Sequence, residues 1–233
     1  MTERGERSLK REKDSLTMGP SSLHVEGDTL VFRINEKASP WPSPIRGEVR
    51  VKSNVQFDER YCLDSAGRHR WRPIAPLARV DVNLTSPRMR WSGEAYCDSN
   101  DGDEPIERGI KSWQWQRGTI DGKAVVMYDV VDLCASKTSL AMQFASDGRV
   151  EALQPPPPCR LSSSKWLMPR TTRSERSASV VETLDDTPFY VRSIIDTHLF
   201  GRALTCVHES LSLKRFASPI VQGMLPFRIR RKP

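Results

Sequence analysis

The stretch Arg79-Val80-Asp81-Val82-Asn83-Leu84 alternates strictly between polar and apolar side chains. Successive side chains of a β-strand point to opposite faces, so this alternation predicts a strand with one buried face. Seven other segments have the pattern or composition of short strands: residues 30–34, 48–52, 89–97, 124–131, 139–144, 179–184 and 204–208. Long segments with a helical period are absent, and the sequence therefore predicts an all-β protein.

Turn residues separate these segments. Glycine combines with Asp, Asn or Ser at residues 27–28, 65–67, 100–102, 121–122 and 147–148, while the proline run 155–158 predicts an extended loop. Many short strands with regular turns are typical of an antiparallel sandwich or barrel.

The domain organisation is predicted from charge and from the placement of strands. Residues 1–15 carry nine charges without apolar periodicity, and we expect a disordered start. We place a boundary at Ser86-Pro87, between a first β unit of residues 16–86 and a second of residues 87–233. Too few strands precede Pro87 to close a barrel of their own.

Composition limits the class of protein. The formal net charge of +7 permits attraction to phosphates of nucleic acid or of an anionic bilayer, and it is also typical of an Arg-rich solvated surface. Sequence patterns of nucleic-acid-binding modules are absent, so we expect no nucleic-acid partner. The five cysteines have no CxxC spacing and indicate ordinary thiols in a reducing compartment. No apolar stretch approaches the ~20 residues of a membrane-spanning helix.

Two short groups are candidates for chemistry. In His69-Arg70-Trp71 and in Tyr96-Cys97-Asp98 the outer residues are two apart, so each pair lies on one side of a strand. One interpretation is a site that combines His69, Trp71, Tyr96 and Asp98. The other is that Tyr96 and Asp98 face water beside a turn.

Four of the six tryptophans fall between Trp71 and Trp115. Trp113 and Trp115 share one strand face, and Trp91 lies between the two candidate groups. These indoles are either core residues or an aromatic wall for an extended ligand. His24, His198 and His208 have no metal-ligand spacing, and we expect them to be structural or exposed.

The segments GRHRWRPIAP (67–76), WSGEAYCDSN (91–100) and WQW (113–115) together are similar to the central region of carotenoid 1,2-hydratases, also called hydroxyneurosporene synthases. Three further segments resemble the carboxy-terminal stretches of that family: TPFY (187–190), HESL (208–211) and MLPFR (224–228). After Trp113 the family pattern usually runs Asp-Trp-Ser-Arg-Ala, from which Gln114 and residues 116–118 depart. Family members begin with a longer amino-terminal region, and we expect this chain to start inside the first of two domains.

The resemblance implies a lipocalin-like antiparallel β fold. It also implies hydration of the terminal C1=C2 double bond of acyclic carotenoids such as neurosporene or lycopene, in carotenoid biosynthesis. The essential His, Trp, Tyr and Asp of the family correspond to His69, Trp71, Tyr96 and Asp98. No cofactor and no metal is implied.

A mechanism follows from that resemblance and from the chemistry of alkenes. Asp98, kept protonated by apolar surroundings, would protonate C2. Trp71 and Tyr96 would stabilise the cation at C1, and His69 would orient the attacking water. Trp91, Trp113 and Trp115 would bind the polyene.

The basic charge and the water-insoluble substrate predict a cytoplasmic protein, peripheral to the inner or photosynthetic membrane. Two alternatives remain: a non-catalytic lipocalin-like carrier of carotenoid or lipid, and a nucleic-acid-binding β module.

Overall fold

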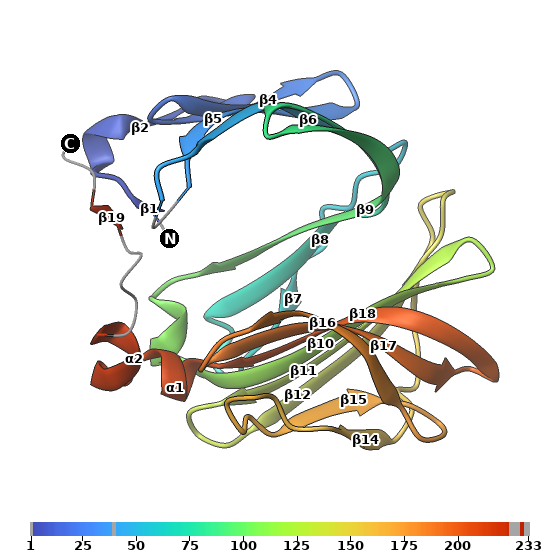
Figure 1. Ribbon diagram of the computed structural model, residues 1–233. Helices are drawn as coiled ribbons and strands as arrows, with labels where there is room; N and C mark the ends of the chain where they lie inside the picture. The colour runs from blue at the N-terminus through green and yellow to red at the C-terminus, as the bar shows by residue number, and fades with distance from the viewer. Residues whose placement is uncertain (1, 39–40, 224–228, 231–233) are drawn as a thin grey trace. The chain divides into compact units, whose positions relative to one another are not determined.

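The structure is a computed structural model that describes residues 2–38, 41–223 and 229–230 (Figure 1). The chain forms two compact units. Unit 1 comprises Met1–Gln56, Ala75–Cys97 and Gly223–Pro233, and unit 2 comprises Phe57–Ile74 and Asp98–Gln222. This division differs from the predicted one, because Ser86-Pro87 lies inside unit 1.

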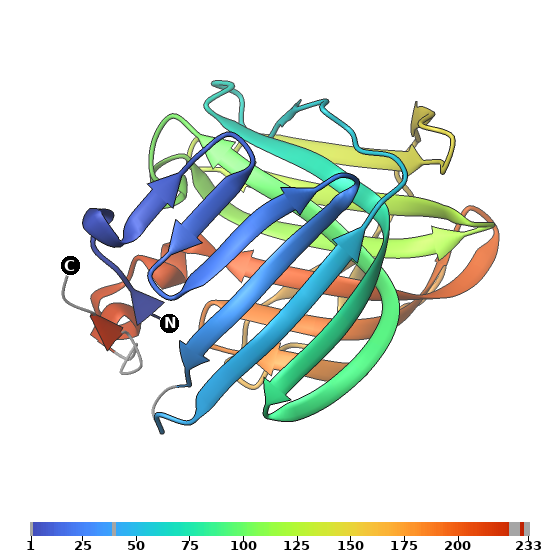
Figure 2. The same cartoon turned by 90° about the horizontal axis from the view of Figure 1, so that it is seen from above.

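Unit 1 is built on one antiparallel sheet in which β2 to β6 and β8 are neighbours in that order (Figure 2). The strands are β2 (Leu9–Arg11), β3 (Ser15–Met18), β4 (Ser21–Glu26), β5 (Thr29–Lys37), β6 (Pro44–Lys52) and β8 (His69–Ser86), with β9 (Arg88–Gly102) paired to β8. β8 belongs to unit 1 from Ala75 onward and β9 as far as Cys97. β1 (Thr2–Glu3) pairs in parallel with β19 (Ile229–Arg230). The 3-10 helix η1 (Glu6–Ser8) and β2 lie within residues 1–15, where a disordered start was expected.

The register of the sheet in unit 1 explains why polar and apolar side chains alternate along its strands. Leu16, Leu23, Phe32, Val49 and Val82 are consecutive cross-strand partners, so five strands contribute one continuous apolar row. Cross-strand pairs of this kind stabilise a sheet only in the matching register, since a one-residue slip would turn every apolar side chain to the other face.

Unit 2 contains a seven-stranded antiparallel sheet in the order β13-β12-β11-β10-β18-β17-β16. Its strands are β10 (Ile110–Ile120), β11 (Lys123–Asp132), β12 (Lys137–Phe144), β13 (Val150–Ala152), β16 (Ser179–Asp186), β17 (Tyr190–Leu199) and β18 (Arg202–Ser212). A separate hairpin, β14 (Pro158–Leu161) and β15 (Arg170–Arg173), lies against one face of this sheet (Figure 1). The other elements are β7 (Tyr61–Cys62), the 3-10 helix η2 (Ile106–Arg108) and the helices α1 (Leu213–Phe216) and α2 (Pro219–Gly223).

β11 is an interior strand of this sheet, between β12 and β10, and is buried on both faces. Ala124, Val126 and Tyr128 lie on one face, and Val125 and Met127 lie on the other; each of these side chains is at most 2% exposed. A strand covered on both sides gains apolar burial at every position, which explains its nearly continuous apolar sequence.

The structure confirms the prediction of an all-β, lipocalin-like antiparallel fold. Each of the eight segments predicted from sequence lies within a strand: β5, β6, β8, β9, β11, β12, β16 and β18.

Candidate functional site

The site begins at the amino-terminal end of β8, where His69, Arg70 and Trp71 alternate between the two faces of the strand. His69 is 1% exposed and Trp71 is fully buried, while the Arg70 guanidinium pairs with Asp101 of β9 and with Asp103 just after that strand. The short strand β7 pairs with β8 at Trp71 and Arg70. The predicted sharing of one strand face by His69 and Trp71 therefore agrees with the structure.

Trp71 and Asp98 are in direct contact. The indole Nε1–H of Trp71 donates a hydrogen bond to Asp98 Oδ2 at 2.9 Å. Both residues belong to unit 2, which β9 enters at Asp98. Two residues that are 27 positions apart in the sequence are thus joined, and Asp98 does not simply face water at a turn.

An aromatic cluster surrounds the Trp71 indole. The ring centroids of Tyr61, Tyr128 and Phe144 lie 5.5, 5.6 and 6.3 Å from that of Trp71. Trp113 extends the cluster, with its ring 5.9 Å from that of Tyr128 in an edge-to-face arrangement. Edge-to-face pairs at these distances are favourable beyond their buried area.

The pKa of Tyr128 reflects how strongly this cluster is shielded from water. Burial raises the pKa of its phenol well above the usual value, and the nearby charges of Asp98 and Glu209 raise it further. The phenol donates a hydrogen bond to Asn100 Oδ1 at 3.3 Å. The Tyr128 phenol is therefore neutral and lies in apolar surroundings, where an added charge is costly.

His69 lies among other groups. Its Nε2 is 3.6 Å from Glu104 Oε1 and 4.0 Å from Asp64 Oδ2, and in the described part of the chain Nε2 itself makes no hydrogen bond. The Gly102 and Gly109 backbones approach the ring closely: a Cβ at Gly102 would be 2.5 Å from Nδ1, and one at Gly109 would be 2.3 Å from Nε2.

The remaining predicted site residues fall into two groups. Trp113 belongs to the aromatic cluster, and Trp115 is 7% exposed beside it on β10, paired with Tyr128. Trp91 and Tyr96 belong to unit 1, where Trp91 is 49% exposed and Tyr96 is half-buried. The roles of all four stay predictions.

Sequence reasoning missed several neighbours of the site: Tyr61, Asp64, Asn100, Glu104, Tyr128 and Phe144. Tyr128 and Phe144 carried a signal, since both lie in predicted strands. Asp64 and Glu104 carried none, because each sits in a turn segment where acidic residues are common.

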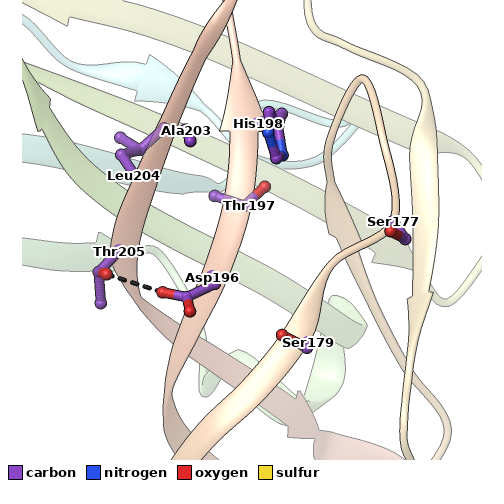
Figure 3. A pocket seen from close by; sticks show the side chains of 8 residues that line it. All are labelled: Ser177, Ser179, Asp196, Thr197, His198, Ala203, Leu204 and Thr205. Carbon is purple, nitrogen blue, oxygen red and sulfur yellow. Dashed lines mark hydrogen bonds between the residues drawn. The ribbon is translucent and has the colours of Figure 1, made fainter.

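An open hollow lies elsewhere in unit 2 (Figure 3). It has a volume of about 410 Å³ and is lined by hydroxyl-bearing side chains beside His198, with Thr205 donating a hydrogen bond to Asp196 at 2.7 Å. None of the predicted site residues lines it.

Two properties concern metals and membranes. Within residues 2–38, 41–223 and 229–230, no group of three His, Cys, Asp or Glu side chains is arranged to hold a metal ion. The helices of the same residues are all too short or too polar to cross a bilayer. The sequence motif at residues 224–228 lies outside the described residues.

Comparisons with known proteins identify relatives that match nearly the whole length of this chain. The acyclic carotenoid 1,2-hydratase of Thiocapsa roseopersicina is 47% identical over 234 residues, which cover 99% of this chain and 58% of the relative. The enzyme of the same name from Rubrivivax gelatinosus is 43% identical, covering 100% and 58%. That from Cereibacter sphaeroides is 38% identical, covering 100% and 84%. This chain thus spans less than two thirds of the first two relatives.

Among solved structures, an AttH-type protein from Nitrosomonas europaea matches with a TM-score of 0.61 at 12% identity, over 89% of this chain and 72% of that one. This likeness concerns the fold alone. The family model described as carotenoid hydratase CrtC matches residues 1–233. The chain therefore belongs to the carotenoid hydratase CrtC family.

Proposed function

We propose that this protein adds water to the terminal C1=C2 double bond of acyclic carotenoids such as neurosporene or lycopene, forming 1-hydroxy-1,2-dihydro products. One observation carries the proposal: a carboxyl group, Asp98, is hydrogen-bonded at 2.9 Å to a fully buried indole, Trp71, inside an aromatic cluster. The relatives named acyclic carotenoid 1,2-hydratases support the same reaction.

The first step is proton transfer. An isolated alkene is a weak base, so the acid must be strong and shielded from water. Asp98 in its neutral form delivers its proton to C2, which forms the C2–H bond and leaves a tertiary cation at C1. Apolar surroundings favour the neutral form of a carboxyl group, and the buried rings of Trp71 and Tyr128 supply such surroundings.

The second element is stabilisation of the cation. The π faces of aromatic rings attract cations, by ~2 kcal/mol or more when the site is desolvated. We assign this role to Trp71, with Tyr96 as its predicted companion on β9. The hydrogen bond to Asp98 holds the indole plane beside the acid.

Water capture completes the reaction. A water molecule attacks C1, the C1–O bond forms, and the extra proton passes to His69 as general base. Return of that proton through solvent to the Asp98 carboxylate regenerates the acid. The net change is addition of one H2O, so the route needs neither redox chemistry nor a cofactor.

We further propose that the protein acts in carotenoid biosynthesis while bound peripherally to the inner or photosynthetic membrane, from which the polyene is drawn. Trp91, Trp113 and Trp115 are the proposed contacts of the chain of double bonds.

Asp98→Asn tests the assignment. The substitution preserves the shape and an acceptor for the Trp71 Nε1–H but removes the transferable proton, so we expect hydration of lycopene to fall by ~100-fold or more while binding persists. Trp71→Phe keeps part of the π density and should cost less, about 10-fold. The assay follows the 1-hydroxy product by chromatography, and in D2O the product should carry one deuterium at C2.

The matched control is Asp101→Asn, because Asp101 lies on the same strand but pairs with Arg70. It should leave turnover near that of the native chain. Native turnover by the Asp98→Asn variant would exclude Asp98 as the acid. Binding of lycopene without turnover in every chain, the native one included, would instead identify a carrier.

A further inference from the structure

Three polar atoms converge in unit 2: His69 Nε2, Asp64 Oδ2 and Glu104 Oε1. Nε2 is 3.6 Å from the Glu104 oxygen and 4.0 Å from the Asp64 oxygen. The side chains of His69 and Asp64 are each 2% exposed and that of Glu104 is 23% exposed. In the described residues, none of the three atoms has a hydrogen bond.

The backbone fixes the geometry of this group. Asp64 Oδ1 accepts hydrogen bonds from the backbone N–H groups of Arg68 at 2.8 Å and His69 at 3.3 Å, which leaves Oδ2 directed at the ring. Gly67, with φ of +68°, makes the turn that brings Asp64 back to His69. The rigid turn thus holds the carboxylate and the imidazole together.

The ring itself has little freedom to rotate. Gly109 lies against Nε2 and Gly102 lies against Nδ1, and a side chain at either position would collide with the ring. Because Gly102 has no side chain, its backbone can pack close to Nδ1. Nε2 therefore faces the carboxylates of Asp64 and Glu104, and Nδ1 faces Gly102, where no side chain would fit.

We propose that Asp64 and Glu104 are positioning residues that hold His69 in the tautomer with its proton on Nε2 and leave the Nδ1 lone pair as the proton acceptor. The inference rests on the proposed function for its role in water capture. A carboxylate can accept a hydrogen bond but cannot donate one, so two of them beside Nε2 favour an N–H there. Both distances are longer than a hydrogen bond, and catalytic hydrogen bonds are often longer before the reacting complex forms than within it.

Neighbouring charges belong to the same arrangement. Arg68 lies 3.3 Å from Glu104 Oε1 and offsets part of the negative charge, and Asp103 is also within electrostatic range of His69.

The direct test is 15N NMR of the four histidines in the native chain, in Asp64→Asn and in Glu104→Gln. Ring nitrogens with and without a proton have well-separated 15N shifts, so the spectrum reports the tautomer without any turnover. We expect protonated Nε2 and unprotonated Nδ1 for His69 in the native chain. In each variant an amide N–H₂ can face Nε2, and the share of this tautomer should fall.

Asp58→Asn is the control, since it removes one carboxylate of unit 2 that pairs with Arg72 and not with His69. It should leave the His69 signals unchanged. A native His69 with its proton on Nδ1, or a tautomer ratio that neither variant changes, would overturn the inference. In Asp64→Asn the side chain retains an Oδ1 acceptor for the N–H groups of Arg68 and His69. Backbone amide chemical shifts as dispersed as those of the native chain would show that the turn persists in this variant.

Turnover supplies the second readout. Each variant should lower kcat for lycopene hydration by about 10-fold or more with little change in KM, because the general base is misdirected while the polyene contacts remain. If the native chain shows the expected tautomer but hydrates no carotenoid, the proposed function fails and the positioning of His69 stands. An unchanged kcat in variants with an altered tautomer would refute its catalytic role.

Discussion

His208 lies on β18, is 0% exposed, and contacts the Thr171 carbonyl oxygen through Nε2 at 2.8 Å. Its pKa is lowered to about 4, chiefly by burial and also by the nearby Arg170, against the raising effect of the hydrogen bond to the Thr171 carbonyl. An unfolded histidine has a pKa of about 6.5, so the unfolded chain binds more protons between these values. Stability should therefore be complete above pH 6.5 and decline as the pH falls toward 4, by up to ~3 kcal/mol.

Urea denaturation followed by tryptophan fluorescence from pH 7.5 to 4 measures this decline. His208→Gln can still donate to Thr171 O and does not titrate, so the slope of stability between pH 6.5 and 5 should shrink. His24→Gln is the control, because His24 is partly exposed beside Glu26 and should leave the slope unchanged. A native slope in His208→Gln would assign the decline to other groups.

At the level of single residues, the sequence predicted part of the candidate site. It singled out Trp71 and Asp98, and it placed His69 and Trp71 on one strand face. It could not predict that His69 faces Asp64 and Glu104, because those contacts depend on a turn and on two glycines that come close only in the folded chain. Tyr128 remained unnoticed for another reason: apolar patterning predicts that a residue is buried but not which rings it touches.

At the level of elements, strands were predictable wherever apolar residues alternate or run together. β14 and β15 were not predicted, because β15 reads Arg-Thr-Thr-Arg and has no apolar periodicity. Its buried face is polar: Gln116 Oε1 accepts from Thr172 Oγ1 at 2.5 Å and from the Arg173 N–H at 3.1 Å. A strand attached by side-chain amides leaves no hydrophobic signal, since polar burial depends on partners that are remote in sequence.

The same contact predicts the effect of Gln116→Leu. Leucine conserves approximate volume but leaves the Thr172 hydroxyl and the Arg173 N–H buried without their acceptor, which should lower the free energy of unfolding by about 1–3 kcal/mol. Hydrogen exchange should show loss of protection at the Arg173 amide. Gln143→Leu on β12, whose amide has only a 3.4 Å bond to Glu151, should change stability by less. Equal losses in both variants would mean that Gln116 does not anchor the hairpin.

Residue 118 is one of the positions on β10 at which the chain departs from the family pattern Asp-Trp-Ser-Arg-Ala. The local packing explains why this position holds glycine. A Cβ at Gly118 would lie 2.6 Å from both Cys206 Sγ and Leu204 Cδ1, so alanine at this position would require these side chains to move. Gln114, Gln116 and Gly118 therefore adapt β10 to the hairpin on one face and to a tightly packed β18 beside it.

For the whole molecule, the net charge and the proposed carotenoid substrate together predict peripheral binding to a membrane. The net charge is +7, and several large apolar side chains are exposed, among them Trp41 at 81%, Leu167 at 77% and Ile220 at 76%. Basic residues near an anionic bilayer contribute about 1 kcal/mol each, and this attraction is screened by salt. Apolar side chains add affinity that salt does not weaken.

Co-sedimentation with vesicles separates the two contributions. With mixed phosphatidylserine and phosphatidylcholine vesicles, we expect strong binding at ~0.05 M salt that falls toward the level of pure phosphatidylcholine vesicles at ~0.5 M salt. Trp41→Ser should weaken binding to both vesicle types at every salt concentration, because it removes an apolar contact. Ser43→Ala, a change at a nearby exposed position, serves as the control. Equal binding to both kinds of vesicle at low salt would rule out the electrostatic part of this prediction, since a net charge of +7 must otherwise distinguish an anionic surface from a neutral one.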